Sequence, residues 1–173
     1  MVDPDDIKAH IPEYHVARAQ NAKNAAFMAH EESMDIASKL RARAIEGRHN
    51  VVIDGTGKDA EKRRRLVEDL KGRGYRVSVA MPHIEKEEGL RRIDSRAERT
   101  GRFIPTDVAT KAYDRIPGNF HTVAAAADDA MLLDNHEAKP RLMYYKKDGV
   151  EQHGPDIHDH LHADFLARHG KKV

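Results

Sequence analysis

Acidic and hydroxyl side chains follow three short apolar stretches of the sequence, and these residue types are suited to catalysis. Asp3–Asp6 follows Val2, Asp54–Thr56 follows Val51–Ile53, and Asp134-Asn135 follows Met131–Leu133. If the apolar stretches are parallel strands, these groups lie at the carboxyl ends of the strands, where such sheets bind ligands. Carboxylates and hydroxyls there suit Mg²⁺ coordination and the activation of a substrate hydroxyl. Asp and Asn also cap helices and form turns, so a structural role stays open for each.

The stretch VVIDGTGKD, residues 51–59, contains a Gly-Lys pair but is not a phosphate-binding Walker A loop. That loop needs G-x-x-x-x-G-K-[ST], whose backbone amides surround phosphates and whose hydroxyl binds Mg²⁺. Here Gly57-Lys58 is followed by Asp59, and Val52 stands where the first glycine is needed. The other Gly-Lys pair, at residues 170–171, is followed by a lysine. The sequence therefore contains no Walker A motif.

Apolar stretches and helical patterns alternate along the chain. One face of a predicted helix over residues 24–46 carries Phe27, Met34, Ala37, Leu40 and Ala44. Asp59 is suited to cap a second helix, and Pro117-Gly118 to break a helical region over residues 106–129. Strands are predicted at residues 51–53, 75–81, 131–133 and 141–145. This alternation favours an α/β fold with a parallel sheet flanked by helices.

The composition indicates a polar globular chain. Its 173 residues are enough for one domain with a hydrophobic core. The net charge of +1 gives no reason to expect a nucleic acid or a membrane as partner. The absence of cysteine excludes disulfides and cysteine metal sites and suits a reducing compartment. Because no apolar run could cross a bilayer and no signal peptide core is present, we expect a cytoplasmic protein.

Several histidines lie near the end of the chain. In HGPDIHDHLHADF, His158, His160 and His162 alternate, and His153 and His169 lie nearby. Alternating histidines on a strand would share one face and could bind Zn²⁺, whereas a helix would align only the pair that is four residues apart. Because the chain holds 12 histidines, we favour an exposed His-rich tail over residues 151–173 and assign no metal ligand there.

Five blocks of sequence occur in order: VDPDDIKAHIPEY, HEESMDIASKLRARAIEGRHNVVIDGTGKD, GYRVSVAMPHI, RRIDSRAERTGRFIP and MLLDN. Their order and spacing resemble the zeta-toxin family of P-loop kinases, which is related to phosphotransferases such as chloramphenicol phosphotransferase. The resemblance covers residues 1 to 145, within a kinase domain expected over residues 1–150. It implies that VVIDGT is a Walker-B-like strand beside the P-loop strand.

The resemblance also implies that part of the family's fold is absent from this chain. Family members begin with an apolar strand, the Walker A loop and a helix, whereas this sequence starts at Met1, where the next segment begins. We therefore expect a P-loop-kinase-like parallel sheet, flanked by helices, without its usual first, central strand and P-loop. The neighbouring strands would keep unpaired backbone groups unless another chain fills the gap, the sheet closes up, or the sequence is a fragment of a longer protein.

The resemblance assigns roles to residues near the strand ends. Asp5 matches the carboxylate that accepts the proton of the substrate hydroxyl. Asp54 matches the acidic residue after the Walker-B-like strand, which would bind Mg²⁺ through water or contact the substrate, and Thr56 matches the hydroxyl beside it. Lys8 matches a lysine early in the family helix, although a solvated lysine is an equal alternative.

Arginines after residue 90 are expected to form a lid over the transferred phosphoryl group. Arg92, Arg96 and Arg99 are spaced four and three residues apart and share one helical face. Arg102 matches the family's Gly-Arg-x-x-Pro feature. Because guanidinium donors stabilise phosphoryl charge, we assign this role to Arg96 and Arg102, with Arg92 contacting the substrate. The alternative is a solvated helix with acidic neighbours as ion-pair partners, and we favour it for Arg99.

The resemblance implies an enzyme that uses Mg²⁺ and transfers the γ-phosphoryl group of ATP to the 3′-hydroxyl of a UDP-N-acetylsugar, although other small hydroxyl substrates stay open. Such a toxin is expected to have an antitoxin. Without a Walker A lysine, we expect the isolated chain to be inactive. A function of another class stays open: a degenerate, non-catalytic binding module that assembles with another chain, such as one supplying the missing strand.

Overall fold

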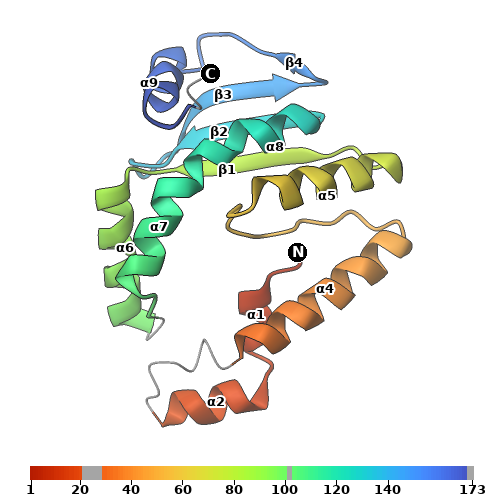
Figure 1. Cartoon of the computed structure of the whole chain (residues 1–173), viewed down its shortest axis with the longest axis vertical. Coiled ribbons are helices and arrows are strands. Elements are labelled where there is room, and N and C mark those ends of the chain that lie inside the picture. The colour runs from red at the N-terminus through yellow and green to blue at the C-terminus, as the bar shows by residue number, and fades with distance from the viewer. Residues whose placement is uncertain (21–28, 101–102, 171–173) are drawn as a thin grey trace. The chain divides into compact units, whose positions relative to one another are not determined.

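The computed structural model describes residues 1–20, 29–100 and 103–170, which form two compact units (Figure 1). The first unit comprises Met1–Thr56 and Arg92–Pro105. The second unit comprises Gly57–Arg91 and Thr106–Val173. All the residues proposed above for catalysis or for binding substrate and Mg²⁺ belong to the first unit.

Helices form the N-terminal part of the first unit. These are α1 (Pro4–Lys8), α2 (Pro12–Ala19) and α4 (His30–Glu46). Asp3 caps α1, because its backbone is extended and its Oδ1 accepts a hydrogen bond from the amide of Asp5 at 2.8 Å. α1 packs against α4, whose buried residues are Ser33 and Ala37. Such small side chains allow two helix backbones to approach closely.

The apolar face predicted for α4 is partly wrong. Ala37 is buried, but Met34 and Leu40 are exposed, and Phe27 lies outside the described residues. The buried side of α4 is set instead by Ser33 and Ala37, which are four residues apart and share one face. The predicted face was chosen by the apolarity of its side chains, whereas the contact between α1 and α4 favours small side chains.

The strand predicted at residues 51–53 is reduced to a single parallel bridge between Val2 and Ile53. In this bridge the amide of Val2 donates to the carbonyl of Val52 at 2.9 Å. Pairing with the N-terminal segment stops there because the next residue, Asp3, already caps α1. Val52 is exposed, so the expectation of a buried strand is also wrong.

The second unit contains a sheet with the strand order β1-β2-β3-β4. Its strands are β1 (Ser78–His83), β2 (Asp129–Asp134), β3 (Arg141–Lys147) and β4 (Val150–Glu151). β1 and β2 are parallel, whereas β3 is antiparallel to both β2 and β4, so the sheet is mixed. The predicted α/β class, with a sheet flanked by helices, is confirmed. The expectation of a parallel sheet holds only for β1 and β2, because the short connection from β2 to β3 allows antiparallel pairing.

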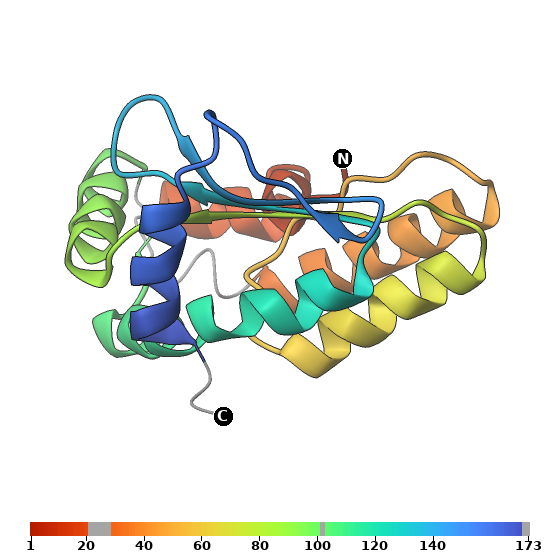
Figure 2. The same cartoon turned by 90° about the horizontal axis from the view of Figure 1, so that it is seen from above.

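Helices α5 (Ala60–Gly72), α8 (Phe120–Ala126) and α9 (Asp159–His169) lie on one face of this sheet (Figure 2). α7 (Thr106–Arg115) leads through the short 3₁₀ helix η1 (Pro117–Asn119) into α8, which confirms the predicted break. α6 (Lys86–Thr100) begins in the second unit and continues into the first. In the described ranges, no helix is both long enough and apolar enough to cross a membrane.

The predicted cap of α5 is also present. Oδ1 of Asp59 accepts a hydrogen bond from the amide of Lys62 at 2.9 Å, as an N-cap does. The helix ends at Gly72, and Gly74 follows with a positive φ of 83° that a glycine adopts without strain. The chain can therefore turn from α5 toward β1.

The core of the second unit lies between the sheet and the helices α8 and α9. Along β2, Ala130, Leu132 and Asp134 are buried in alternation, as expected for a strand with one covered face. The ring of Tyr144 on β3 packs edge-on against that of Phe120 on α8, with centroids 5.8 Å apart. The main core cluster consists of Phe120, Ala124, Ala130, Leu132, Met143, Tyr144 and Phe165.

The C-terminal segment is not the exposed tail that its histidine content suggested. α9 packs against β3, and Phe165 is only 3% exposed within the core cluster, with Leu161 packed beside it. These two apolar residues are four positions apart and therefore share one face of α9. The surrounding histidines and aspartates obscured this short amphipathic pattern.

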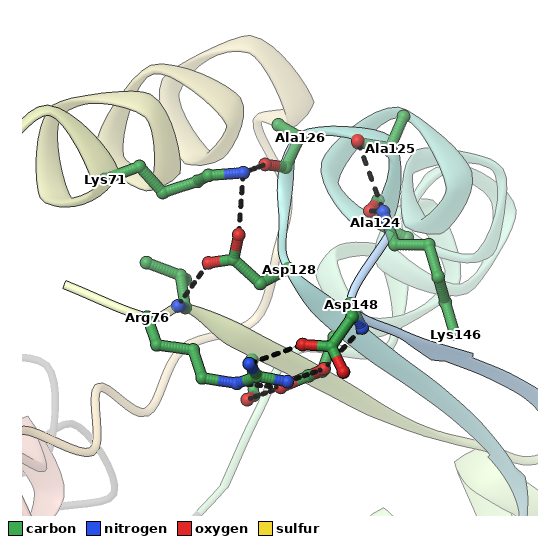
Figure 3. Close-up of polar contacts among 11 residues, drawn as sticks. Lys71, Arg76, Ala124, Ala125, Ala126, Asp128, Lys146 and Asp148 are labelled. Atoms are coloured by element: carbon green, nitrogen blue, oxygen red, sulfur yellow. Dashed lines mark hydrogen bonds and ion pairs between the residues drawn. The ribbon is translucent and has the colours of Figure 1, made fainter. Parts of the chain in front are cut away.

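Two lysines bind the last carbonyl groups of α8 (Figure 3). Lys71 of α5 donates to the carbonyl of Ala126 at 3.1 Å. The buried Lys146 of β3 donates to the carbonyls of Ala124 and Ala125. Ammonium groups at a helix C-terminus satisfy carbonyls that lack partners inside the helix and interact favourably with its dipole. These hydrogen bonds connect the end of α8 to both α5 and the sheet.

Three aspartates hold the start of β1 next to the start of β2 (Figure 3). Asp128 accepts a hydrogen bond from the amide of Val77 at 2.8 Å. Arg76 forms ion pairs with Asp129 at 2.6 Å and with Asp148 at 2.5 Å. Hydrogen bonds from Arg76 and from the amide of Asp148 lower the pKa of Asp129 to about 2. These contacts connect β1, β2 and the turn after β3.

We predict that Phe165→Ala will lower the free energy of unfolding by about 3–5 kcal/mol, because the change leaves a cavity in a packed core. Leu166→Ala on the same helix is the matched control, since Leu166 is 40% exposed and should cost less than about 1 kcal/mol. Urea unfolding followed by circular dichroism measures both variants. Equal losses for the two variants would contradict the placement of Phe165 in the core.

The aspartate contacts predict a dependence of stability on acidity. Because the pKa of Asp129 is about 2 in the folded protein, below its usual value of about 3.9, its interactions stabilise the fold above pH ~4 and are lost as the pH falls toward 2. Asp129→Asn should therefore lower the Tm at pH 7 and weaken the acid dependence of the Tm. The control is Asp107→Asn, which removes an exposed partner of Lys111 at 3.5 Å and should leave both unchanged.

Candidate functional site

The parallel bridge of the first unit directs two acidic segments toward one edge. Val2 and Ile53 are paired in the same direction, so the residues that follow each of them leave the bridge on the same side. Asp3 and α1 follow Val2, and Asp54 follows Ile53. The strand-end rule used on the sequence therefore applies here, although only one residue pair forms the ladder.

The acidic groups before and within α1 differ in what they bind. Asp3 is a helix cap, so the structural alternative holds for its carboxylate. The side chain of Asp5 is 43% exposed and its Oδ1 accepts a hydrogen bond from Nζ of Lys8 at 3.0 Å. Lys8 is not a solvated lysine, because its side chain is only 10% exposed. Asp5 is thus held by a buried ammonium group and still reaches the surface.

Asp54 and Thr56 lie in an irregular segment and are exposed. Among the described residues, neither side chain has a hydrogen-bonding partner. A carboxylate and a hydroxyl two residues apart offer oxygen atoms of the kind that Mg²⁺ binds. These are the residues that the sequence assigned to Mg²⁺ and substrate, and their oxygen atoms remain accessible.

The Gly-Lys pair that resembles part of a P-loop is arranged differently from one. Gly57 has a positive φ of 69°. Asn119 of η1 donates from Nδ2 to the carbonyl of Gly57 at 3.0 Å and to the carbonyl of Lys58 at 3.2 Å. A phosphate-binding loop presents amide groups to its ligand, whereas this turn presents carbonyls to an amide side chain. The structure agrees with the sequence that this turn is not a Walker A loop.

The predicted lid arginines are only partly described. Arg92 is partly buried and Arg96 is exposed on α6, four residues apart on one face of the helix. Within the described part of the chain, the guanidinium of Arg96 forms no ion pair. Arg102 lies outside the described residues. Arg99 donates from Nε to the carbonyl of Ser95 at 3.4 Å, a contact within its own helix.

The third strand-end acid, Asp134, has a structural role. It is 5% exposed, and its carboxylate binds His136 at 2.5 Å and Nε of Arg141 at 3.0 Å. Burial disfavours the charged carboxylate, but the hydrogen bonds from His136 and Arg141 outweigh burial and lower the pKa of Asp134. A carboxylate already occupied in this way is a poor Mg²⁺ ligand. Apart from their closeness along the chain, nothing in the sequence indicated that His136 and Arg141 would bind Asp134.

The C-terminal histidines do not form a metal site of their own among the described residues. His158 and His160 contact each other through their rings, and His162 contacts His121 of α8 at 3.3 Å. In the part of the chain that the structure describes, one group of side chains could hold a metal ion: His83, Glu85 and His169. The sequence did not indicate this group, because His169 lies far along the chain from His83 and Glu85 and no local pattern connects them.

We predict that Asp5→Ala will destabilise the protein more than Lys8→Met. The first change leaves a buried ammonium without this partner and should cost about 1–3 kcal/mol, whereas the second leaves a carboxylate that water can reach. Urea unfolding of the two variants and of the double variant tests the asymmetry. If Lys8→Met proves the more harmful change, Lys8 does not depend on Asp5.

Comparison with known proteins assigns the chain to a family. The zeta toxin family model matches residues 1–145, which is most of the sequence. No curated protein and no solved structure matches the chain. The match covers α1, the bridge at Ile53, the arginines of α6 and the first two strands of the sheet. The chain therefore belongs to the zeta toxin family, whose members are toxins with a kinase-like function.

Proposed function

We propose that the chain provides the acceptor side of a zeta-toxin kinase, which transfers the γ-phosphoryl group of ATP to a hydroxyl of a UDP-N-acetylsugar in the cytoplasm. The observation that carries this proposal is the family match over residues 1–145, which includes the surface carboxylate of Asp5 on α1. Asp5 is the proposed base, and Lys8 is the residue that positions it. A base must be ionised, fixed in direction and accessible; the ion pair with Lys8 supports the first two, and the 43% exposure of the Asp5 side chain supports the third.

The oxygen atoms of Asp54 and Thr56 are suited to Mg²⁺. Both side chains are exposed and neither is engaged by another described residue. Mg²⁺ binds through one or two protein oxygens and keeps several waters, so a site of this size fits the ion. When bound, Mg²⁺ would neutralise phosphate charge. Asp54 would hold it through water, and Thr56 would lie beside it.

The residues of this chain do not fit the triphosphate of ATP. The sequence has no G-x-x-x-x-G-K-[ST] motif, and the turn at Gly57 presents carbonyls instead of amides. Phosphoryl transfer depends on a positioned phosphate group and on positive charge around it. We therefore expect no turnover of Mg·ATP by these 173 residues alone.

Arginines of α6, together with Arg102 outside the described residues, are the proposed donors to phosphate oxygens on the acceptor side. Arg96 is exposed and forms no ion pair with another described residue, which leaves its guanidinium available. Arg92 would contact the substrate diphosphate, and Arg102 would stabilise the transferred group. Planar guanidinium groups bind phosphates through two parallel hydrogen bonds, so one arginine carries much of the recognition.

A second function is favoured by the absence of a Walker A motif: a non-catalytic module that binds another chain, such as an antitoxin or a chain that supplies a phosphate-binding strand. Both proposed functions would use residues of the first unit. They differ in whether the chain recognises a nucleotide sugar, which a binding experiment can decide.

Calorimetric titration with UDP-N-acetylglucosamine tests the proposal. We expect binding without ATP, and roughly tenfold weaker binding for Arg96→Gln, because one charge-assisted hydrogen-bonding group is lost. Arg65→Gln removes the same charge from an exposed position of α5 and should bind as the wild type does. Phosphoryl transfer from labelled ATP should be undetectable.

The possible outcomes separate the proposals. Turnover of ATP by the chain alone would refute the expected inactivity. An absence of nucleotide-sugar binding would refute the proposed acceptor and favour the non-catalytic module. Equal weakening by Arg96→Gln and Arg65→Gln would show that binding depends on overall charge and not on α6.

A further inference from the structure

Three side chains with metal-binding atoms meet at the end of β1. His83 is the last residue of β1, Glu85 follows two residues later, and His169 is the last residue of α9. One ligand atom from each lies within 4.8 Å of the others, and Nε2 of His83 is 3.6 Å from a carboxylate oxygen of Glu85. All three belong to the second unit.

The surrounding packing fixes the two imidazoles. The ring of Phe165 contacts His83 with centroids 4.9 Å apart and His169 with centroids 5.0 Å apart. The backbone at His169 is held close to η1, because a Cβ on Gly118 would lie 3.2 Å from the carbonyl oxygen of His169. The carbonyl of His83 accepts a hydrogen bond from the amide of Asn135 at 2.8 Å. Both rings therefore sit on rigid elements.

The nitrogen atoms of these rings are poorly satisfied. Nε2 of His169 is buried and, among the described residues, has no hydrogen-bonding partner. His83 is 7% exposed, and its 3.6 Å contact with Glu85 is longer than a hydrogen bond. Leaving a buried polar atom unpaired destabilises a fold, so such atoms call for a physical explanation. A bound cation between the rings and the carboxylate would satisfy both nitrogens.

The chemical state of the rings suits a metal. Burial, reinforced by the neighbouring His169, lowers the pKa of His83. Burial also lowers the pKa of His169 and outweighs the opposing effect of Glu85. A lowered pKa favours the neutral imidazole, which is the form that binds metals.

A cavity of about 230 Å³ adjoins the cluster, and His83, Glu85, Asp114, Arg168 and His169 are among its lining residues. Asp114 is engaged by Lys86 at 2.7 Å. Arg168, which is about half exposed, forms an ion pair with Glu85. The cavity leaves room for a water molecule as a further ligand, and Arg168 is the cation with which a metal would compete for Glu85.

We propose that His83, Glu85 and His169 form a Zn²⁺ site that clamps the C-terminal end of α9 to the end of β1. Two imidazoles and one carboxylate form a ligand set that Zn²⁺ uses with water in the fourth position. Bonds of about 2.0–2.2 Å would hold neighbouring ligands roughly 3.4 Å apart, close to the present distance between His83 and Glu85. The three ligand atoms, which lie within 4.8 Å of one another, would have to approach further to bind one ion. This site is separate from the acceptor residues proposed above.

Titration of the untagged full chain with Co²⁺, a coloured substitute for Zn²⁺, tests the site. We expect one equivalent to bind with visible absorption typical of a four-coordinate ion, and Zn²⁺ to displace it. His169→Ala and Glu85→Gln should weaken Zn²⁺ binding at least tenfold. His160→Ala, which removes an exposed histidine from the same helix, should bind as the wild type does.

Arg168→Gln gives a change in the opposite direction. Because the guanidinium competes for Glu85, its removal should tighten Zn²⁺ binding several-fold, which nonspecific binding to histidines would not do. Zn²⁺ should also raise the Tm of the wild type but not of Glu85→Gln, a variant that keeps the shape of the side chain. Absence of the Co²⁺ absorption, or equal effects of His160→Ala and His169→Ala, would overturn the proposal.

Discussion

The parallel register of β1 and β2 is the constraint on which the second unit depends. Leu132 in the middle of β2 is completely buried, so a slip by one residue would turn it away from the core. The same register pairs Ser78 with Asp129 at one end and His83 with Asp134 at the other. The ion pairs of Arg76 stabilise the end at Ser78 and Asp129. At the other end, the register brings His83 and Asp134 next to each other.

Groups at strand ends differ in function according to whether the fold already satisfies them. Asp134 has hydrogen-bonding partners on two sides, and Asp3 caps a helix, so both stabilise local structure. By comparison, His169 at the end of α9 has a buried nitrogen without a partner among the described residues, and Asp54 has an accessible carboxylate. Position at a strand end therefore selects candidates, and hydrogen-bonding partners identify those candidates that already have a structural role.

The sequence predicted local features well where a residue acts on its own neighbours. The cap at Asp59, the break at Pro117-Gly118 and the buried strand around Leu132 depend on a few adjacent residues, and all three are present. Features that depend on distant partners were not predictable. The burial of Phe165 and the pairing of His83 with His169 arise because α9 returns to the sheet, which no local pattern encodes.

For the candidate site residues as well, features set by adjacent residues were predictable and features set by distant partners were not. The exposure of Asp54 agrees with its position after an apolar stretch, but the burial of Lys8 was not foreseen, because lysines are usually solvated. The predicted strand at residues 51–53 failed for a related reason. A strand needs a neighbour to pair with, and in the described residues Val2 alone supplies one.

The position of the proposed base depends on interactions that its own helix cannot supply. α1 has five residues, and a helix of that length is unstable by itself because nucleation is costly. The cap by Asp3, the packing on α4 and the burial of Lys8 hold it in place. Since Lys8 also orients Asp5, one ion pair contributes both to the fold of the first unit and to the direction of the carboxylate proposed as the base. Stability and the geometry of the proposed base are therefore coupled, and a substitution that disturbs one is expected to disturb the other.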